Sequence, residues 1–275
     1  MTKRKAYLAI DIGGTKTLVA VFSESGDVVY KNKFSTNPNY SKFIEELKQL
    51  ANKDLKNYQL KLCCCGAPGY IDRRRGIVRR FGNLNWHNVP LKEDVGRALG
   101  GVAVLVENDA KLAGLSEAIL VQKKYNNVLY LTISTGIGDG IIINGKIDSN
   151  LADSEAGQMV IEHKGQLVRW EDIASGRALV EEYGKKASQI DDPLIWKRYV
   201  MGLAKGIDTL VAVLRPEVII IGGGVGAHFE KFDKLLVQEL EKFENRMIKM
   251  PPILKAKRPE EAVIYGCYDF IKQQS

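Results

Sequence analysis

The chain of 275 residues has no apolar run of about 18 residues, the length that a membrane-spanning helix needs. It also has no low-complexity segment and no long linker. Residues 1–5 lead directly into an apolar segment and do not resemble a signal peptide, so we expect a cytoplasmic protein with no membrane partner. With 45% hydrophobic residues, the chain can bury enough core for one large or two medium domains.

Cysteine is scarce as well, and its placement argues against a cysteine-based site. Three of the four cysteines are consecutive, Cys63 to Cys65, within a predicted strand over 60–65, and the fourth is Cys267. Neighbouring residues on a strand point to opposite faces, so at most Cys63 and Cys65 share one face. The pattern favours buried small side chains over a metal site or a disulfide.

Charge of neither sign dominates, because charged residues make up 27% of the chain and the formal net charge is +7. Arginine runs at 73–75 and 79–80 nevertheless raise the question of nucleic-acid binding. We expect these arginines to lie in a solvated loop. A role in holding a phosphorylated ligand is the alternative.

The most informative stretch is 6–22, where one apolar run enters a glycine-rich turn and a second leaves it. Both flanks are rich in Val, Ile, Leu and Ala, as buried strands are. Glycine lets a phosphate approach the backbone with no Cβ in the way. The predicted phosphate-binding residues are Asp11, Gly13, Gly14, Thr15 and Lys16. Because a carboxylate beside phosphates is repulsive without a divalent cation between them, Asp11 implies Mg²⁺ held through water. An ordinary Gly-Gly hairpin is the alternative.

A second strand–turn–strand unit of the same kind occupies 127–146, about 120 residues later. Its turn is marked by Thr135, Gly136 and Gly138. Asp139 follows, either to bind Mg²⁺ through water or to face solvent. Two turns of this type suggest a nucleotide held in a cleft between two related halves.

A third glycine cluster, 222–226, follows the apolar run 218–221. It is either a tight strand-to-helix turn or a surface where an adenine or ribose lies against the backbone. In the second interpretation Gly223 and Gly224 pack against the nucleoside.

These three turns resemble, in the same order, the two phosphate motifs and the adenosine motif of the actin/hexokinase/Hsp70 ATPase superfamily. Within it, the chain resembles the ROK family of bacterial sugar kinases and related repressors, and its glucokinase-type members most of all. The resemblance extends from Ala6 to about Phe270. It implies ATP and Mg²⁺ as cofactors.

Further segments between these turns are similar to ROK motifs. They are Gly-Ala-Pro-Gly at 66–69, Asn-Leu-Asn-Trp at 83–86, Glu-Asn-Asp-Ala at 107–110, Glu-Ala-Gly-Gln at 155–158 and Trp-Glu-Asp-Ile-Ala-Ser-Gly at 170–176. The resemblance implies a sugar site made of Gly66, Asn83, Asn108, Asp109, Glu155, Gln158 and Glu171. Glu155 and Glu171 would accept hydrogen bonds from vicinal sugar hydroxyls, and a solvated surface charge is the alternative for each.

The resemblance assigns the catalytic base to Asp109. Phosphoryl transfer depends mainly on alignment and charge neutralisation, but the attacking hydroxyl must still lose a proton. A carboxylate that takes this proton contributes typically about 10²–10⁴-fold. Asp109 follows the apolar run 102–106 and precedes a helical pattern over 110–121, so the alternative is a simple N-cap. Asn108 and Asp109 can divide the two roles.

The chain departs from the family pattern at two places. Gln158 stands where ROK proteins usually have His; it can donate and accept hydrogen bonds but cannot become positively charged. The family's zinc signature is also absent. His163 is present, but no cysteine lies between Cys65 and Cys267, and a tetrahedral zinc site needs about four ligands. We therefore predict no zinc.

We predict an α/β protein with two ribonuclease-H-like domains, each a mixed sheet flanked by helices, and an active site in the interdomain cleft. The expected domains are 1–117 and 118–258, with the C-terminal helix 259–275 returning to the first. Helical patterns also cover 41–51, 91–99, 110–121, 176–186, 192–214 and 229–243. Pro259 and the two acids after it are typical of a helix N-terminus.

The resemblance implies an ATP-dependent hexose kinase that acts on glucose at its 6-hydroxyl, or on N-acetylmannosamine, N-acetylglucosamine, fructose or allose. The competing hypothesis is a sugar-binding sensor that has lost phosphoryl transfer. Asp11 and Asp109 argue against it, because a pure binder needs neither a metal carboxylate nor a base. Repressor relatives carry a helix-turn-helix, for which the five residues before the first strand leave no room, so we expect no nucleic-acid partner. Relatives also suggest a homodimer.

Overall fold

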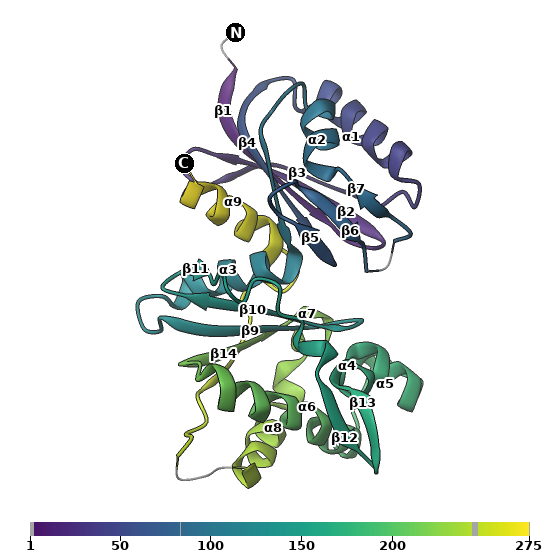
Figure 1. Ribbon diagram of the computed structural model, residues 1–275, viewed down its shortest axis with the longest axis vertical. Coiled ribbons are helices and arrows are strands. Elements are labelled where there is room, and N and C mark those ends of the chain that lie inside the picture. The colour runs from purple at the N-terminus through teal and green to yellow at the C-terminus, as the bar shows by residue number, and fades with distance from the viewer. Residues whose placement is uncertain (1–2, 83, 244–246, 275) are drawn as a thin grey trace. The chain divides into compact units, whose positions relative to one another are not determined.

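The computed structural model describes residues 3–82, 84–243 and 247–274 (Figure 1). The chain divides into two compact units. The first consists of Met1–Ser116 together with Glu261–Ser275, and the second of Glu117–Glu260. Each unit has its own central sheet and its own hydrophobic core.

The first unit is built on a five-stranded sheet of order β3-β2-β1-β4-β8. The strands are β1 (Arg4–Ile12), β2 (Lys16–Ser23), β3 (Val28–Ser35), β4 (Tyr58–Ala67) and β8 (Val104–Asn108). β1, β2 and β3 pair in antiparallel fashion, whereas β4 runs parallel to both β1 and β8. The carboxyl ends of β1, β4 and β8 therefore meet at one edge of the sheet.

Helices cover both faces of this sheet. They are α1 (Tyr40–Asp54), α2 (Leu91–Ala98), α3 (Asp109–Val121) and α9 (Ala262–Gln274). Leu8 and Ile10 of β1 belong to the core that includes α1 and α2, whereas Ala9 belongs to the core that includes Leu112 of α3 and α9, the yellow helix of Figure 1. The cysteines follow the same alternation, as predicted: Cys63 and Cys65 face the first core, Cys64 faces the second, and all are buried and free.

A small antiparallel sheet is also part of the first unit. It consists of β5 (Tyr70–Asp72), β6 (Ile77–Arg80) and β7 (His87–Val89), in that order. The turn between β5 and β6 carries the arginine run 73–75.

The second unit has a sheet of order β11-β10-β9-β14-β15. Its strands are β9 (Asn127–Ile133), β10 (Ile137–Ile143), β11 (Lys146–Ile147), β14 (Val218–Gly222) and β15 (Ile253–Lys255). β9 and β10 form the expected hairpin around the second glycine turn, and β14 runs parallel to β9. A separate hairpin pairs β12 (Val160–His163) with β13 (Gln166–Arg169).

The helices of the second unit are α4 (Trp170–Ala174), α5 (Gly176–Tyr183), α6 (Pro193–Leu214), α7 (Gly223–Gly226) and α8 (Asp233–Leu240). The long helix α6 packs on α4 at Gly206, where a Cβ would lie 2.0 Å from the Trp170 ring. Glycine is thus required for this close approach. Among the described residues, no helix is both long enough and apolar enough to cross a membrane.

Three predicted helices differ in extent from the helices of the structure. The helix expected over 176–186 stops at Tyr183, because Gly184 adopts a left-handed φ of +65° and caps it. The helix expected over 229–243 is interrupted: 3₁₀ turns flank α8, and the first brings Phe229 and Phe232 into the core together. The last helix begins at Ala262 instead of Pro259.

A buried carboxylate in α3 holds the segment that leads toward α9. Glu117 is 1% exposed and accepts hydrogen bonds from Lys257 N at 2.9 Å and Arg258 N at 2.6 Å. These bonds fix the backbone just before the chain re-enters the first unit at Glu261.

We expect Glu117→Ala to lower the free energy of unfolding by about 2–3 kcal/mol, because two backbone donors lose a charged acceptor in a buried position. Glu117→Gln, which keeps an acceptor oxygen, should lose less. Urea unfolding measures the difference, with Glu45→Ala on the exposed surface of α1 as the control. Equal midpoints for Glu117→Ala and Glu45→Ala would contradict this interpretation.

Candidate active site

The predicted site residues of the first unit gather at the carboxyl edge of its sheet. In the strand register Asp11 of β1 lies beside Gly66 of β4, and Gly66 lies beside Glu107 of β8. Asn108 ends β8 and Asp109 begins α3. The topology therefore brings Asp11 and Asp109, 98 positions apart in the sequence, to one edge.

The pKa values of both carboxyl groups are raised. Burial, and after it the nearby charge of Asp109, raises the pKa of Asp11 from 3.8 to about 7, against an opposing effect of Lys33. Burial also raises the pKa of Asp109, although the Ala110 N–H and the Lys111 charge act in the other direction. Both side chains keep partial contact with solvent. The edge thus holds two acids whose ionised forms are disfavoured by burial, and the charge of Asp109 adds to this effect at Asp11.

The Asp11 carboxyl group is of a type that suits a hard divalent cation. Mg²⁺ usually binds through one or two carboxylates, and waters and substrate phosphates complete its shell. The described part of the chain contains no group of three or more His, Cys, Asp or Glu residues that could hold a metal by themselves. A carboxylate such as Asp11 is the type of ligand that a metal arriving with a nucleotide would use.

Asn108 supplies the cap of α3. Its Oδ1 accepts hydrogen bonds from Ala110 N at 3.0 Å and Lys111 N at 3.3 Å, and its Nδ2 donates to Gly69 O at 3.3 Å. Asp109 Oδ1 accepts from Ala110 N at 2.8 Å. Because Asn108 serves the capping role, the Asp109 carboxyl group is not needed for it.

Hydrogen bonds stabilise the base of the first glycine turn, and the residues at its tip are exposed or partly exposed. Gly13 N donates to Lys16 O at 3.0 Å, and Thr36 Oγ1 donates to Gly13 O at 2.8 Å. Thr36 also shares a hydrogen bond with the buried Thr17, at 2.9 Å between their hydroxyl oxygens. Thr15 and Lys16 are exposed and Gly14 is partly so, which leaves the turn accessible to a phosphate.

Gly66 has a packing role that the sequence did not reveal. A Cβ at this position would lie 2.5 Å from Val263 Cγ1 and 3.1 Å from Leu112 Cδ1. Glycine therefore lets α3 and α9 approach β4 closely, which places the start of α3 at the edge of the sheet. Asn83, predicted to contact the sugar, lies outside the described residues.

In the second unit, Glu171 lies against the second glycine turn. Its Oε2 accepts from Ile137 N at 3.4 Å, and a Cβ at Gly136 would lie 2.7 Å from the same oxygen. Gln158 Nε2 donates to Glu171 Oε1 at 2.9 Å. The structure thus brings two predicted sugar-site residues together beside a predicted phosphate turn, whereas Glu155 is exposed.

The expectation that Asp139 faces solvent was wrong. The residue is 1% exposed, and its Oδ1 accepts from Ala156 N at 2.8 Å. Ser154 Oγ donates to its other oxygen. Asp139 is thus buried and anchors the segment that carries Glu155, which no sequence motif indicated.

A cavity of about 480 Å³ lies within the second unit, next to the second glycine turn and the third glycine cluster. Its lining residues are Ser134, Thr135, Gly176, Arg177, Val180, Lys186, Ala187, Ser188, Gly224, Val225 and His228. Arg177, Lys186 and His228 were not predicted. Arg177 directly follows the Ser-Gly pair of the 170–176 motif, and this position is the feature of the sequence from which its place at the cavity could have been predicted.

Gly223 and Gly224 differ in their surroundings. Gly223 has a φ of +79°, and a Cβ there would lie 2.6–2.8 Å from the backbone of Ile133. Gly224 lines the cavity, and a Cβ there would meet nothing within 4 Å. Gly223 is thus required for the turn, whereas Gly224 is free to contact a ligand.

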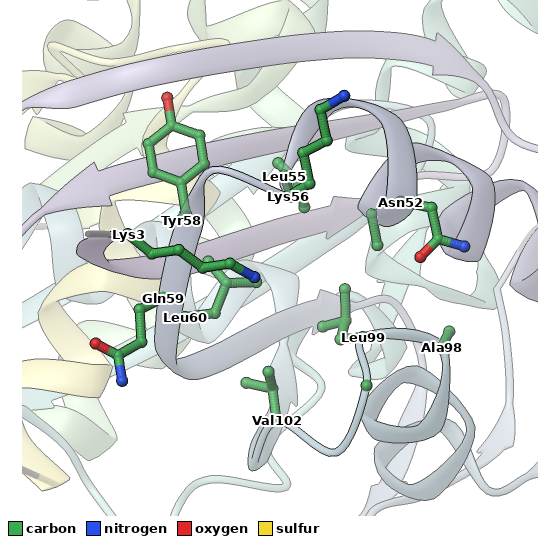
Figure 2. Close-up of a pocket in the computed structure, with 12 residues that line it drawn as sticks. Lys3, Asn52, Leu55, Lys56, Tyr58, Gln59, Leu60, Ala98, Leu99 and Val102 are labelled. Atoms are coloured by element: carbon green, nitrogen blue, oxygen red, sulfur yellow. The ribbon is translucent and has the colours of Figure 1, made fainter. Parts of the chain in front are cut away.

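A second cavity, of about 650 Å³, lies at the opposite edge of the first unit's sheet (Figure 2). It is lined by residues at the amino ends of β1 and β4, among them Lys3, Tyr58 and Gln59, and by the ends of α1 and α2. It contains no carboxylate and none of the predicted site residues. We therefore do not assign the active site to it.

The expectation of a solvated arginine loop was wrong for Arg73. Its guanidinium pairs with Glu107, which is 3% exposed, and the shortest of their contacts is 2.7 Å. Arg79 of the second run pairs with Asp72 at 2.8 Å. Arg74 and Arg75 are exposed as expected.

Comparisons with known proteins give one family model and several sugar kinases. A profile described as "ROK family" matches residues 7–274. A glucokinase from Streptomyces coelicolor is 32% identical over 190 residues, which cover 66% of this chain and 60% of that protein's length. An N-acetyl-D-glucosamine kinase from Haemophilus influenzae is 26% identical and matches 94% of this chain and 97% of its own.

Solved structures confirm the predicted α/β fold. A ROK family glucokinase from Streptomyces griseus, in complex with glucose and AMPPNP, superposes with a TM-score of 0.83 at 24% identity, covering 98% of this chain and 99% of the other. A ROK family transcriptional regulator, a homologue of the E. coli MLC protein, gives 0.82 at 19% identity and covers 98% and 78%. The same fold thus occurs in a kinase and in a regulator.

Burial of Asp11, and after it the nearby charge of Asp109, predicts that Asp11→Asn raises the free energy of unfolding in a pH-dependent way. Because the pKa of Asp11 is about 7 in the folded protein and near 3.8 when unfolded, the wild type loses stability as the pH rises between these values. We expect the ligand-free variant to exceed wild type in free energy of unfolding by about 1–3 kcal/mol at pH 8, and by less at pH 5. Urea unfolding at both pH values tests this. A difference that does not change with pH would contradict it.

Proposed function

This chain belongs to the ROK family, and on that premise we propose that it is an ATP-dependent hexose kinase with glucose, phosphorylated at its 6-hydroxyl, as the first candidate substrate. One observation supports the proposal above the others. The carboxyl groups of Asp11 and Asp109 lie at one sheet edge, next to an accessible glycine turn that a triphosphate can approach.

In the proposed reaction Asp109 is the general base. Its carboxylate accepts the proton of the attacking sugar hydroxyl, and its raised pKa makes it a better acceptor than an ordinary aspartate. Asn108 and the capped first turn of α3 hold it in place. Asp11 would hold Mg²⁺ through water, and the ion would neutralise charge on the phosphates.

The remaining predicted residues divide between nucleotide and sugar. The backbone of Gly13, Gly14 and Thr15, with Lys16, would contact phosphates, as would the second turn at Thr135, Gly136 and Gly138. The 480 Å³ cavity beside Gly224 would receive the nucleoside, with Arg177 and Lys186 available to anionic groups. Glu155, Gln158 and Glu171 would bind sugar hydroxyls. The proposal requires both sets of residues to engage one ATP and one sugar.

The similar proteins favour a sugar as the substrate, but they do not indicate which sugar. A glucokinase and an N-acetyl-D-glucosamine kinase are both similar to this chain, and the glucokinase is matched over 60% of its length only. Gln158, bonded to Glu171 where ROK proteins usually have His, keeps the alternative of a sugar-binding sensor open. The experiments below separate the two.

A screen of ATP-dependent ADP release with glucose, N-acetylglucosamine, N-acetylmannosamine, fructose and allose should identify a substrate. On that substrate we expect Asp109→Asn to retain sugar binding by calorimetry and to lose 100-fold or more in turnover, because only the proton acceptor is removed. Asp54→Asn at the end of α1 serves as the control and should match wild type. Stabilisation by a sugar without ADP release on any of them would support the sensor.

The neighbouring glycines provide a matched test of the nucleoside site. Gly223→Ala should lower the free energy of unfolding by about 2 kcal/mol or more, because its φ is unfavourable and Ile133 blocks the methyl group. Gly224→Ala should fold normally and raise the KM for ATP several-fold, because its methyl group enters the space beside the cavity. An unchanged KM for ATP in Gly224→Ala would argue against this cavity as the nucleoside site.

A further inference from the structure

Arg73 and Glu107 form an ion pair that the proposed chemistry does not use directly. Arg73 lies in the turn between β5 and β6, and Glu107 lies in β8, two residues before Asp109. Arg73 Nε donates to the two carboxylate oxygens at 3.0 and 2.8 Å, and Nη2 donates to Oε1 at 2.7 Å. Because Glu107 is 3% exposed, the guanidinium compensates a charge that is almost fully removed from water.

The same carboxylate holds the backbone that leads into α3. Glu107 Oε1 accepts a hydrogen bond from Asn108 N at 2.7 Å. Asn108 then caps α3 through its Oδ1 and reaches Gly69 O through its Nδ2. A continuous set of contacts therefore connects the Arg73 guanidinium with the residue that precedes Asp109 and with the first turn of α3.

The competing interpretation is that the pair only fastens the small β5–β6–β7 sheet to β8. A buried ion pair is a weak source of stability, because an apolar pair of similar volume is often at least as stable. Fastening alone also does not need a carboxylate that bonds to the Asn108 N–H. The planar, three-contact geometry instead fixes the orientation of Glu107 Oε1, and with it the Asn108 backbone.

We propose that Arg73 is a positioning residue for the catalytic base: through Glu107 and the Asn108 backbone it fixes the orientation of the first turn of α3, on which Asp109 stands. This inference rests on the proposed role of Asp109. A displacement of about 1 Å in a reacting group can cost about 10²-fold in rate, so loosening this turn should reduce turnover more than sugar binding.

Hydrogen exchange and kinetics test the proposal together. In Arg73→Met we expect the backbone amides of Asn108 to Lys111 to exchange tenfold faster or more, and kcat to fall tenfold or more with less than a threefold change in sugar affinity. Arg73→Lys keeps the charge but not the planar fork, so it should lie between wild type and Arg73→Met. Arg74→Met, which alters an exposed arginine of the same run, is the matched control and should resemble wild type.

A double variant separates positioning from folding, since Arg73→Met leaves Glu107 unpaired and could destabilise the chain. In Arg73→Met/Glu107→Gln no unpaired charge remains, and the glutamine oxygen can still accept from Asn108 N but is no longer oriented by a guanidinium. We expect its urea midpoint to return close to wild type while kcat stays fivefold or more below it. Recovery of kcat together with stability would assign the pair a structural role and overturn the proposal.

The exchange measurement does not depend on the reaction. Unchanged exchange at Asn108 to Lys111 in a folded Arg73→Met would overturn the inference whatever the activity. If wild type phosphorylates no sugar, the proposed function fails, and faster exchange in Arg73→Met would still show that Arg73 controls the start of α3.

Discussion

The structure of the candidate site depends on one electrostatic constraint, the proximity of two carboxyl groups at the carboxyl edge of parallel strands. Asp11 ends the apolar run of β1, and Asp109 opens the helix after β8, so the sheet topology brings both to one edge, with Gly66 of β4 between their strands. Burial, and after it the nearby charge of Asp109, raises the pKa of Asp11 to about 7. This arrangement does not stabilise the fold. It does suit a site that binds a divalent cation and a polyphosphate.

The surroundings of these acids show how that arrangement is maintained. Gly66 lets α3 and α9 pack closely on β4, Asn108 caps α3, and Glu107 holds the Asn108 backbone under the control of Arg73. In the second unit Asp139 plays a comparable part, because it anchors the segment of Glu155 from a buried position. In both units, buried polar residues outside the proposed chemistry orient a residue that is proposed to take part in it, the partly buried Asp109 in the first and the exposed Glu155 in the second.

Much of the fold could be predicted from the sequence because its signals are local. Glycine-rich turns between apolar runs located the hairpins around Gly13 and Gly136, and strand alternation assigned Cys64 to a different face from its neighbours. Contacts between residues far apart in the sequence could not be predicted, because the sequence near a charged residue does not indicate which distant residue it contacts in the fold. From the sequence, Arg73 was therefore expected in a solvated loop and Asp139 was allowed a place facing solvent, although each contacts a distant segment.

The central claim is that Asp109 faces the reacting hydroxyl. The most direct measurement is a crystal structure of the chain with a sugar identified as its substrate, Mg²⁺ and a non-hydrolysable ATP analogue. The account predicts an Asp109 carboxylate oxygen about 2.6–3.2 Å from the hydroxyl that is phosphorylated, with Asp11 on the metal side of the phosphates. A sugar bound with Asp109 turned away, or with another acid at that hydroxyl, would contradict it.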